Sequence, residues 1–241
     1  MRNIEIESGE YYHVYNRGVE RRRVFLKPEH FERFYQSLAM FNDVSYKHHG
    51  CQTFKESVES YRSLGTVERR FVDIVAFALL PNHFHFLLRQ KEDGGIAKFL
   101  QKVQQGYTRF FNLSHGRTGC LFSSSYQAEH IDSDSHFEHM VRYIHLNPLD
   151  VGGLPWRLDD EKKTTYSEVI DYLSTYPWSS HHVYLSGKQS FPVVDLEHVN
   201  WLCNTPSDYE RYLASWFDLP YLSYGKNAEP HTSQLSSAFT P

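Results

Sequence analysis

Two histidines separated by one residue carry the strongest chemical signal in this chain. His83 and His85 lie in the segment FVDIVAFALLPNHFHFLLRQ (residues 71–90), where apolar runs around a Pro-Asn turn predict two consecutive strands. Successive side chains of a strand point to opposite faces, so both imidazoles share one face, an arrangement that suits a metal ion. With 15 histidines in 241 residues, about one such pair arises by chance, so the pair alone does not establish a site.

A second segment, HFEHMVRYIHLNP (residues 136–148), could supply a nucleophile. Residues 132–135 offer helix-capping side chains and Pro148 a stop, which predicts a helix. Tyr143 and Asn147 are four residues apart and therefore share one helix face, which would present a phenol and an oxygen ligand together. An ordinary polar pair on an amphipathic helix explains the same spacing. The apolar positions at helical spacing, which form the predicted buried stripe, are Phe137, Met140, Val141 and Ile144.

Five segments in chain order form a larger pattern. They are YYHVYNRGVERRRVF (residues 11–25), DIVAFALLPNHFHFLLR (73–89), GGIAKFLQKVQQGYTRFFN (94–112), RYIHLNPLD (142–150) and YPWSS (176–180). Together they resemble the single-tyrosine HUH transposases, and within them the REP-associated tyrosine transposases, relatives of the transposases of the smallest bacterial insertion sequences. The resemblance spans residues 8–185.

The resemblance implies an α+β fold, in which a ferredoxin-like antiparallel sheet carries helices on one face and the histidine pair lies on a central strand. The sequence pattern agrees with this fold class. It predicts strands at residues 11–17, 71–80 and 83–89, helices at 28–42 and 96–112, and a weaker extended stretch at 121–131. The polar residues 48–69 are interpreted as an insertion or long loop. We expect a transposase domain over residues 1–185 and a small, partly helical C-terminal appendage over 186–241, with residues 230–241 disordered.

The resemblance also implies the chemistry of the site. Tyr143 is the nucleophile, His83 and His85 are two ligands of Mg²⁺ or Mn²⁺, and Asn147 takes the place of the third, polar ligand. A phenol with a pKa of about 10 is a poor nucleophile at neutral pH, so a metal is needed to polarise the phosphate. The family cleaves single-stranded DNA with palindromic hairpins, keeps the 5′ phosphate on the tyrosine and releases a 3′ hydroxyl. A monomer and a homodimer that exchanges tyrosines both stay open.

The charge of the chain is distributed unevenly. The net charge is −4 overall, with about +5 on residues 1–120 and about −9 on residues 121–241. A DNA-binding surface is therefore expected in the first half, although a solvated charged face is an equal interpretation. The predicted DNA contacts are Arg17, Arg21, Arg22 and Arg23, together with Lys98, Lys102 and Arg109 on the second helix.

Other features of the sequence limit the possible location and function of the protein. No apolar run reaches membrane-spanning length, no signal peptide is recognised and the three cysteines are scattered, so we expect a cytoplasmic protein. Residues 123–129, SSSYQAE, stand where relatives carry a basic stretch. This departure motivates an alternative, a domesticated hairpin DNA-binding protein without transposition activity. A simple metal phosphoesterase is disfavoured because it leaves Tyr143 idle. No role is assigned to His13, His130, His136, His139 or His145.

Overall fold

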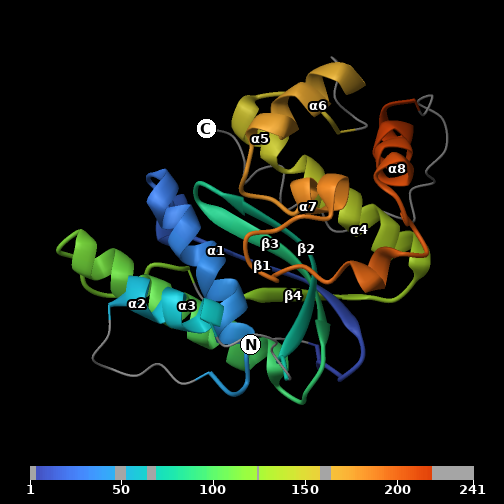
Figure 1. The fold of residues 1–241 in the computed structure, drawn as a ribbon. Coiled ribbons are helices and arrows are strands. Elements are labelled where there is room, and N and C mark those ends of the chain that lie inside the picture. Colours follow the sequence, from blue (N-terminus) through green and yellow to red (C-terminus); the bar gives the residue numbers. More distant parts are fainter. Residues whose placement is uncertain (1–3, 47–52, 64–68, 124, 158–163, 219–241) are drawn as a thin grey trace.

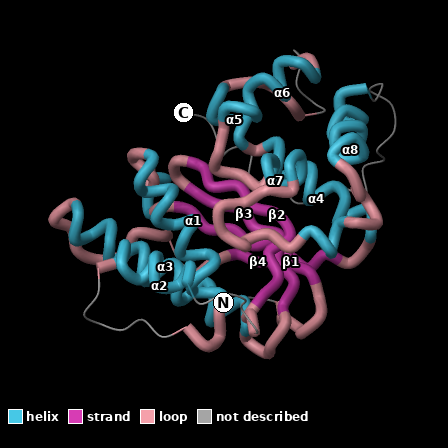
Figure 2. Tube along the Cα trace, viewed as in Figure 1, coloured by secondary structure: helices cyan, strands magenta, loops and turns pink. Residues whose placement is uncertain are grey.

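A four-stranded antiparallel sheet forms the centre of the fold (Figures 1 and 2). The computed structural model describes residues 4–46, 53–63, 69–123, 125–157 and 164–218. The strand order is β2-β3-β1-β4, and β3 is therefore an interior strand. This order with a β-α-β-β-α-β succession is that of a ferredoxin-like sheet, so the predicted α+β class is confirmed. The strands are β1 (Tyr11–Arg17), β2 (Val72–Leu80), β3 (His83–Gln90) and β4 (Gln127–Ile131).

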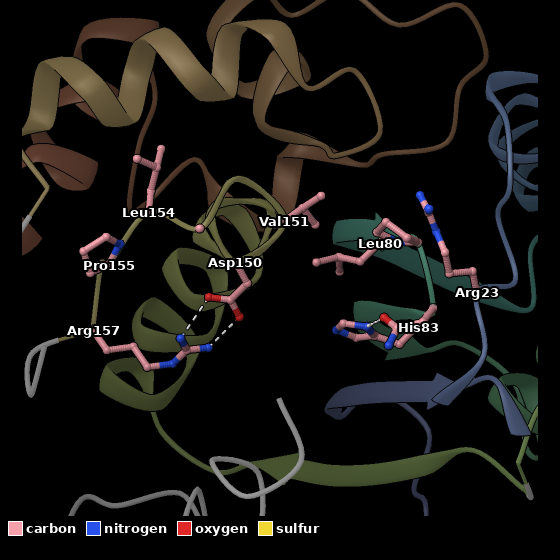
Figure 3. Close-up of a pocket in the computed structure, with 11 residues that line it drawn as sticks. Arg23, Leu80, His83, Asp150, Val151, Leu154, Pro155 and Arg157 are labelled. Carbon is pink, nitrogen blue, oxygen red and sulfur yellow. Dashed lines mark hydrogen bonds and ion pairs between the residues drawn. The ribbon is translucent and has the colours of Figure 1, made fainter. Parts of the chain in front are cut away.

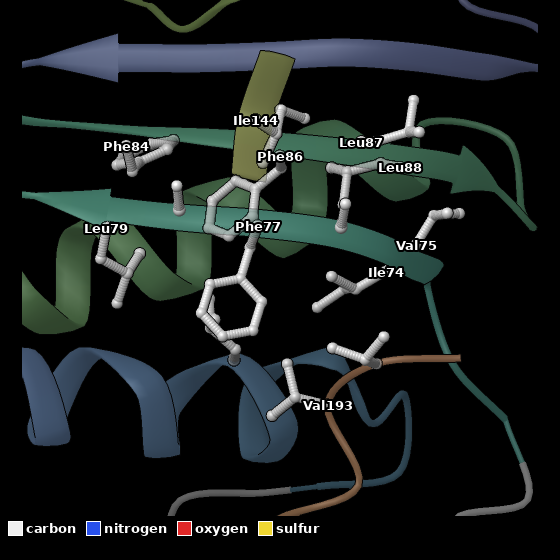
Figure 4. Packing of buried hydrophobic residues seen from close by; sticks show 14 of the residues in the cluster. Ile74, Val75, Phe77, Leu79, Phe84, Phe86, Leu87, Leu88, Ile144 and Val193 are labelled. Atoms are coloured by element: carbon white, nitrogen blue, oxygen red, sulfur yellow. The ribbon is translucent and has the colours of Figure 1, made fainter. Parts of the chain in front are cut away.

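Helices cover both faces of this sheet, whereas the sequence predicted helices on one face. Phe84 and Phe86 of β3 contact Phe34 of α1 (Pro28–Asn42) and Phe99 of α3 (Gly95–Ser114). On the opposite face, His85 contacts α4 (Asp134–Leu146). The physical reason lies in β2, which is buried at all nine positions and must be covered on both sides. Figure 4 shows the apolar side chains of β2 and β3 in this core, with Ile144 of α4 among them.

The predicted strands and helices agree with the structure within a few residues, except that the extended stretch predicted at residues 121–131 is a strand only over Gln127–Ile131. One further segment needs a correction. The residues 48–69, interpreted as an insertion or long loop, contain α2 (Phe54–Ser63) between residues that lie outside the described part. The helix begins with a capping box, in which the Thr53 amide donates to the Glu56 carboxylate and the Glu56 amide donates to the Thr53 hydroxyl. Val58 and Tyr61 face the core. The Thr-x-x-Glu spacing was therefore a helix signal in the sequence.

A buried polar network attaches the last described helix to the sheet. The Tyr209 hydroxyl lies 3.0 Å from His145 Nδ1 and 2.7 Å from His181 Nδ1, while His145 Nε2 lies 2.7 Å from the Ser180 hydroxyl. Burial lowers the pKa of His181 to about 3, so the network is uncharged at neutral pH. The remaining elements are η1 (Val19–Arg21), α5 (Pro148–Gly152), α6 (Tyr166–Thr175), α7 (His181–Ser186), η2 (Leu196–Val199) and α8 (Pro206–Asp218).

The described part of the predicted appendage, residues 186–218, thus includes a helix that packs against α4 and α7. The division of the chain at residue 185 stays a prediction, and residues 230–241 lie outside the described residues. None of the helices described is long and apolar enough to cross a membrane.

Candidate active site

The sheet face that α4 covers carries several of the candidate site residues predicted from the sequence. In the antiparallel pairing of β1 with β3, Tyr15 is opposite His85 and Arg17 is opposite His83. Paired residues of an antiparallel ladder project to the same face. Both histidines therefore share their face with Tyr15 and Arg17, and α4 lies over it.

The two imidazoles are held in the neutral form. His83 Nδ1 lies 2.6 Å from the Asn82 side-chain oxygen, which accepts a hydrogen bond from it, so Nε2 keeps its lone pair. Burial lowers the pKa of His83 to about 4 and lowers that of His85 well below its ordinary value. The ring centroids are 5.0 Å apart. Neutral imidazoles with basic nitrogens are the form that binds metals.

Helix α4 brings Tyr143 onto this pair. The helix is capped by Ser133, whose hydroxyl accepts from the His136 amide, and ends at Asn147. The half-buried Tyr143 ring meets the His85 ring edge-to-face, with centroids 5.6 Å apart. The Asn147 amide donates to the Tyr143 carbonyl oxygen over 2.8 Å. The phenol and both histidines therefore come together within one chain.

The chemistry of the donor atoms at this site fits a divalent cation. Within the described part of the chain, the buried His85 Nε2 and Asn147 Oδ1 have no hydrogen-bond partner. An unsatisfied buried polar atom costs about 1–3 kcal/mol, a cost that a bound ligand removes. Two imidazole nitrogens with one amide oxygen form a donor set suited to Mn²⁺ and acceptable to Mg²⁺.

A second group of possible ligands lies at the other end of the β2–β3 hairpin. Oxygen and nitrogen atoms of Asp73, Asp195 and His198 lie within 4.8 Å of one another. The buried Asp73 carboxylate already accepts from Lys91 Nζ at 3.0 Å and pairs with His198 Nε2 at 3.1 Å. Since this charge is already compensated, we assign the group a structural role.

An open pocket of about 670 Å³ adjoins His83 (Figure 3). Asp150 and Arg157 form a two-pronged ion pair on one side, with N–O distances of 2.9 and 2.7 Å, and Arg23 lies on the other. The walls are mainly apolar. Besides these residues, the pocket is lined by Leu80, Pro81, Asn82, Val151, Gly153, Leu154 and Pro155.

The same ion pair affects the phenol. Burial raises the pKa of Tyr143, the Asn147 side chain and the Arg157 guanidinium lower it, and the Asp150 carboxylate raises it. The sequence analysis gave neither Asp150 nor Arg157 a role. Asp150 lies in RYIHLNPLD, one of the five segments that carry the family resemblance, whereas no sequence pattern pointed to a function for Arg157.

The predicted basic residues divide between two surfaces. Arg17 is exposed beside His83, and Arg23 lines the pocket. Arg21 ends η1 and Arg22 follows it, and within η1 Glu20 and Arg21 have left-handed φ angles of 55° and 58°. Such conformations cost about 1–3 kcal/mol each. Arg22 pairs with the Glu20 carboxylate at 3.4 Å, and Arg23 is the arginine of this segment that lines the pocket.

The basic residues of α3 lie on the opposite face of the sheet. Lys98 Nζ donates to the Asp93 carbonyl oxygen, and Lys102 Nζ is 4.8 Å from the centre of the Phe71 ring. Arg109 is exposed. These three residues cannot contact a phosphate held at the histidines, and their role in DNA binding stays a prediction.

Comparison with known proteins gives one family. Residues 55–147 match the family of IS200-like transposases, and this segment contains His83, His85, Tyr143 and Asn147. The resemblance to insertion-sequence transposases predicted from the sequence is thereby confirmed. A solved REP-associated tyrosine transposase bound to a REP hairpin is similar to this chain with 15% identity and a TM-score of 0.48, over 81% of this chain and 93% of that one. No curated protein matches the chain.

Proposed function

We propose that this chain, similar over residues 55–147 to the IS200-like transposases, cleaves single-stranded DNA beside a hairpin and transfers the cut strand. The observation that carries the proposal is the Tyr143 ring lying against His85, 5.6 Å between centroids, next to the unsatisfied Asn147 oxygen. A Mg²⁺ or Mn²⁺ ion bound by His83, His85 and Asn147 would polarise the phosphate.

Tyr143 supplies the nucleophile. Its phenolic oxygen forms a bond to phosphorus while the bond from phosphorus to the 3′ oxygen breaks. The phenol proton passes to solvent, and the leaving 3′ oxygen takes up a proton. The 5′ phosphate stays on Tyr143 as a phosphodiester, so a second 3′ hydroxyl can reverse the reaction and join strands without ATP.

The surrounding residues prepare this attack. Arg157 favours the ionised phenol, because its guanidinium lowers the pKa of Tyr143 against the effect of burial. Asn147 bonds to the Tyr143 carbonyl and holds the last turn of α4. Arg17 and Arg23 flank His83 and can contact neighbouring phosphates.

The pocket beside His83 supports a single-stranded substrate. Its apolar walls offer a place for an unstacked base, which a duplex keeps buried in its stack. A strand next to a hairpin presents such bases together with a defined shape. The substrate we propose is therefore single-stranded DNA that carries a palindromic hairpin.

A second function, hairpin binding without cleavage, is favoured by one observation. Glu129 on β4 is opposite His13 in the sheet, where the family pattern suggests basic side chains. Its carboxylate repels phosphate and weakens binding near the site. Formation of a covalent protein–DNA adduct separates the two functions.

A hairpin oligonucleotide labelled separately at each end provides the test. With Mn²⁺ and a 3′ label, a denaturing gel should show a labelled protein–DNA adduct, because the fragment on the 3′ side keeps the 5′ phosphate. With a 5′ label, the released strand should run free and be extended by a polymerase from its 3′ hydroxyl. Tight hairpin binding with no adduct under any metal would favour the second function, and an adduct carrying the 5′ label would contradict the polarity.

The Arg157→Gln protein should cleave more slowly at neutral pH. Removing the guanidinium raises the pKa of Tyr143, so the ionised phenol appears only at higher pH, and one pKa unit corresponds to roughly a tenfold loss of rate. The pH–rate profile should shift to the alkaline side. Adding Asp150→Asn should return part of the activity, because the Asp150 charge acts in the opposite direction. A profile identical to wild type would contradict this role.

A further inference from the structure

We propose that His13 and Glu129 are positioning residues that fix the proton and the orientation of His85, an inference that rests on the proposed function. His13 Nε2 lies 2.9 Å from His85 Nδ1, and the rings are nearly parallel at 9°, with centroids 5.1 Å apart. His13 is 3% exposed and His85 1%. Because both rings are buried, water does not compete for this hydrogen bond. The bond therefore sets the orientation of the His85 ring.

Three neighbouring strands build this contact. His13 on β1 is opposite Glu129 on β4, and the next site-facing residue of β1, Tyr15, is opposite His85 on β3. Side chains of paired residues share a face, so Glu129, His13 and His85 form a row across the sheet. The row ends at His85 Nε2, the unsatisfied atom beside Tyr143.

The position of the shared proton follows from the two ends of the row. The Glu129 carboxylate lies 3.8 Å from His13 Nδ1, which is beyond hydrogen-bond distance, and its negative charge favours a proton on that nitrogen. His13 Nε2 then accepts, and His85 Nδ1 donates to it. This leaves a lone pair on His85 Nε2. The reverse arrangement would turn the lone pair of His13 Nδ1 toward the Glu129 carboxylate and put a proton on His85 Nε2, which could then bind no cation.

This assignment gives Glu129 a positive role. Residues 123–129, which include Glu129, were interpreted from the sequence as the loss of a basic stretch that would weaken DNA binding. A lysine or arginine at position 129 would repel a proton from His13 Nδ1 and oppose the arrangement that His85 needs. Carboxylate–histidine partners of this kind raise the basicity of a metal-binding imidazole, and their loss typically weakens metal affinity about 10–100-fold.

Metal affinity is the first measurement. Mn²⁺ titration followed by electron paramagnetic resonance should show affinity about 10–100-fold weaker in His13→Leu than in wild type. His13→Gln, whose side-chain oxygen can accept from His85 Nδ1, should keep most of the affinity. The matched control is His130→Leu, an exposed histidine of β4, which should bind as wild type. Equal losses in His13→Leu and His13→Gln, or no loss in either, would overturn the proposal.

The tautomers supply a second readout that needs no metal and no variant. Two-bond ¹⁵N–¹H correlations of the wild-type protein without metal should show protons on Nδ1 of both His13 and His85. A proton on His85 Nε2 would refute the assignment even if cleavage were normal. Wild-type protein that binds no Mn²⁺ but shows the expected tautomers would count against the proposed function instead, so the two failures are distinguishable.

Discussion

The Tyr143→Phe protein is expected to form no covalent adduct with hairpin DNA in the presence of Mn²⁺. Loss of an attacking residue typically lowers rates by about 10⁴–10⁶-fold, so cleavage should fall below detection. The fold should persist, because the ring contacts with His85 and Trp156 do not need the hydroxyl. We expect the free energy of unfolding to change by less than about 1 kcal/mol. Denaturing electrophoresis of labelled DNA measures the first quantity and urea unfolding the second.

A second phenol at the site provides the matched control. The half-buried Tyr15 ring lies 5.7 Å from His85, about as near as that of Tyr143. Tyr15 projects from a strand, whereas Tyr143 projects from the helix that also carries Asn147. Tyr15→Phe should therefore still form the adduct. An adduct that persists in Tyr143→Phe but is lost in Tyr15→Phe would assign the nucleophile to the strand.

The local parts of the site could be predicted because they depend on short repeats. The two-residue period of a strand places His83 and His85 on one face, and the four-residue spacing on α4 places Asn147 one turn after Tyr143. Neither inference requires knowledge of the rest of the chain. The same holds for β1, whose alternation of side chains predicted its bounds.

The parts that were missed depend on contacts between distant segments. His13 contacts His85 across 72 positions of sequence, so its role becomes visible only when β1 pairs with β3. Arg157 reaches the site because α5 turns the chain back toward His83. The second layer of helices was missed because the apolar sequence of β2 indicates only that the strand is buried. It does not indicate that separate helices pack against its two faces.

The proposed DNA binding requires local positive charge on a chain whose net charge is −4. Arg17 and Arg23 lie next to His83, while much of the acidic charge belongs to the second half of the sequence. Exposed charges interact over roughly a Debye length, about 8 Å at physiological salt, so local charge matters more than the total. Under the proposed function, a few arginines beside the scissile phosphate would orient the strand, and affinity for long duplex would stay low.

Replacing His83 or His85 with Ala should abolish cleavage, because each change removes one of the two nitrogen ligands. Charge stabilisation by a bound metal is worth several kcal/mol, so the expected loss is at least about 10³-fold. The two variants should differ in stability. His83→Ala removes the hydrogen bond to the adjacent Asn82, whereas His85→Ala removes the buried hydrogen bond to His13 and leaves a polar atom of that ring without its partner inside the protein. We expect a cost of about 1 kcal/mol in the first and about 2–3 kcal/mol in the second.

Ligand-dependent stability separates the loss of metal from the loss of fold. Mn²⁺ at a hundred times its dissociation constant stabilises a folded protein by about 2.7 kcal/mol. The unfolding temperature of wild type should therefore rise when Mn²⁺ is added and return to its metal-free value when a chelator removes the ion. His83→Ala should unfold near the temperature of metal-free wild type and show no such rise. If His83→Ala and His85→Ala both cleave hairpin DNA at the wild-type rate, the histidine pair takes no part in the reaction. Tyr143 must then act through other groups of the site, such as Arg157, whose guanidinium lowers the pKa of the phenol.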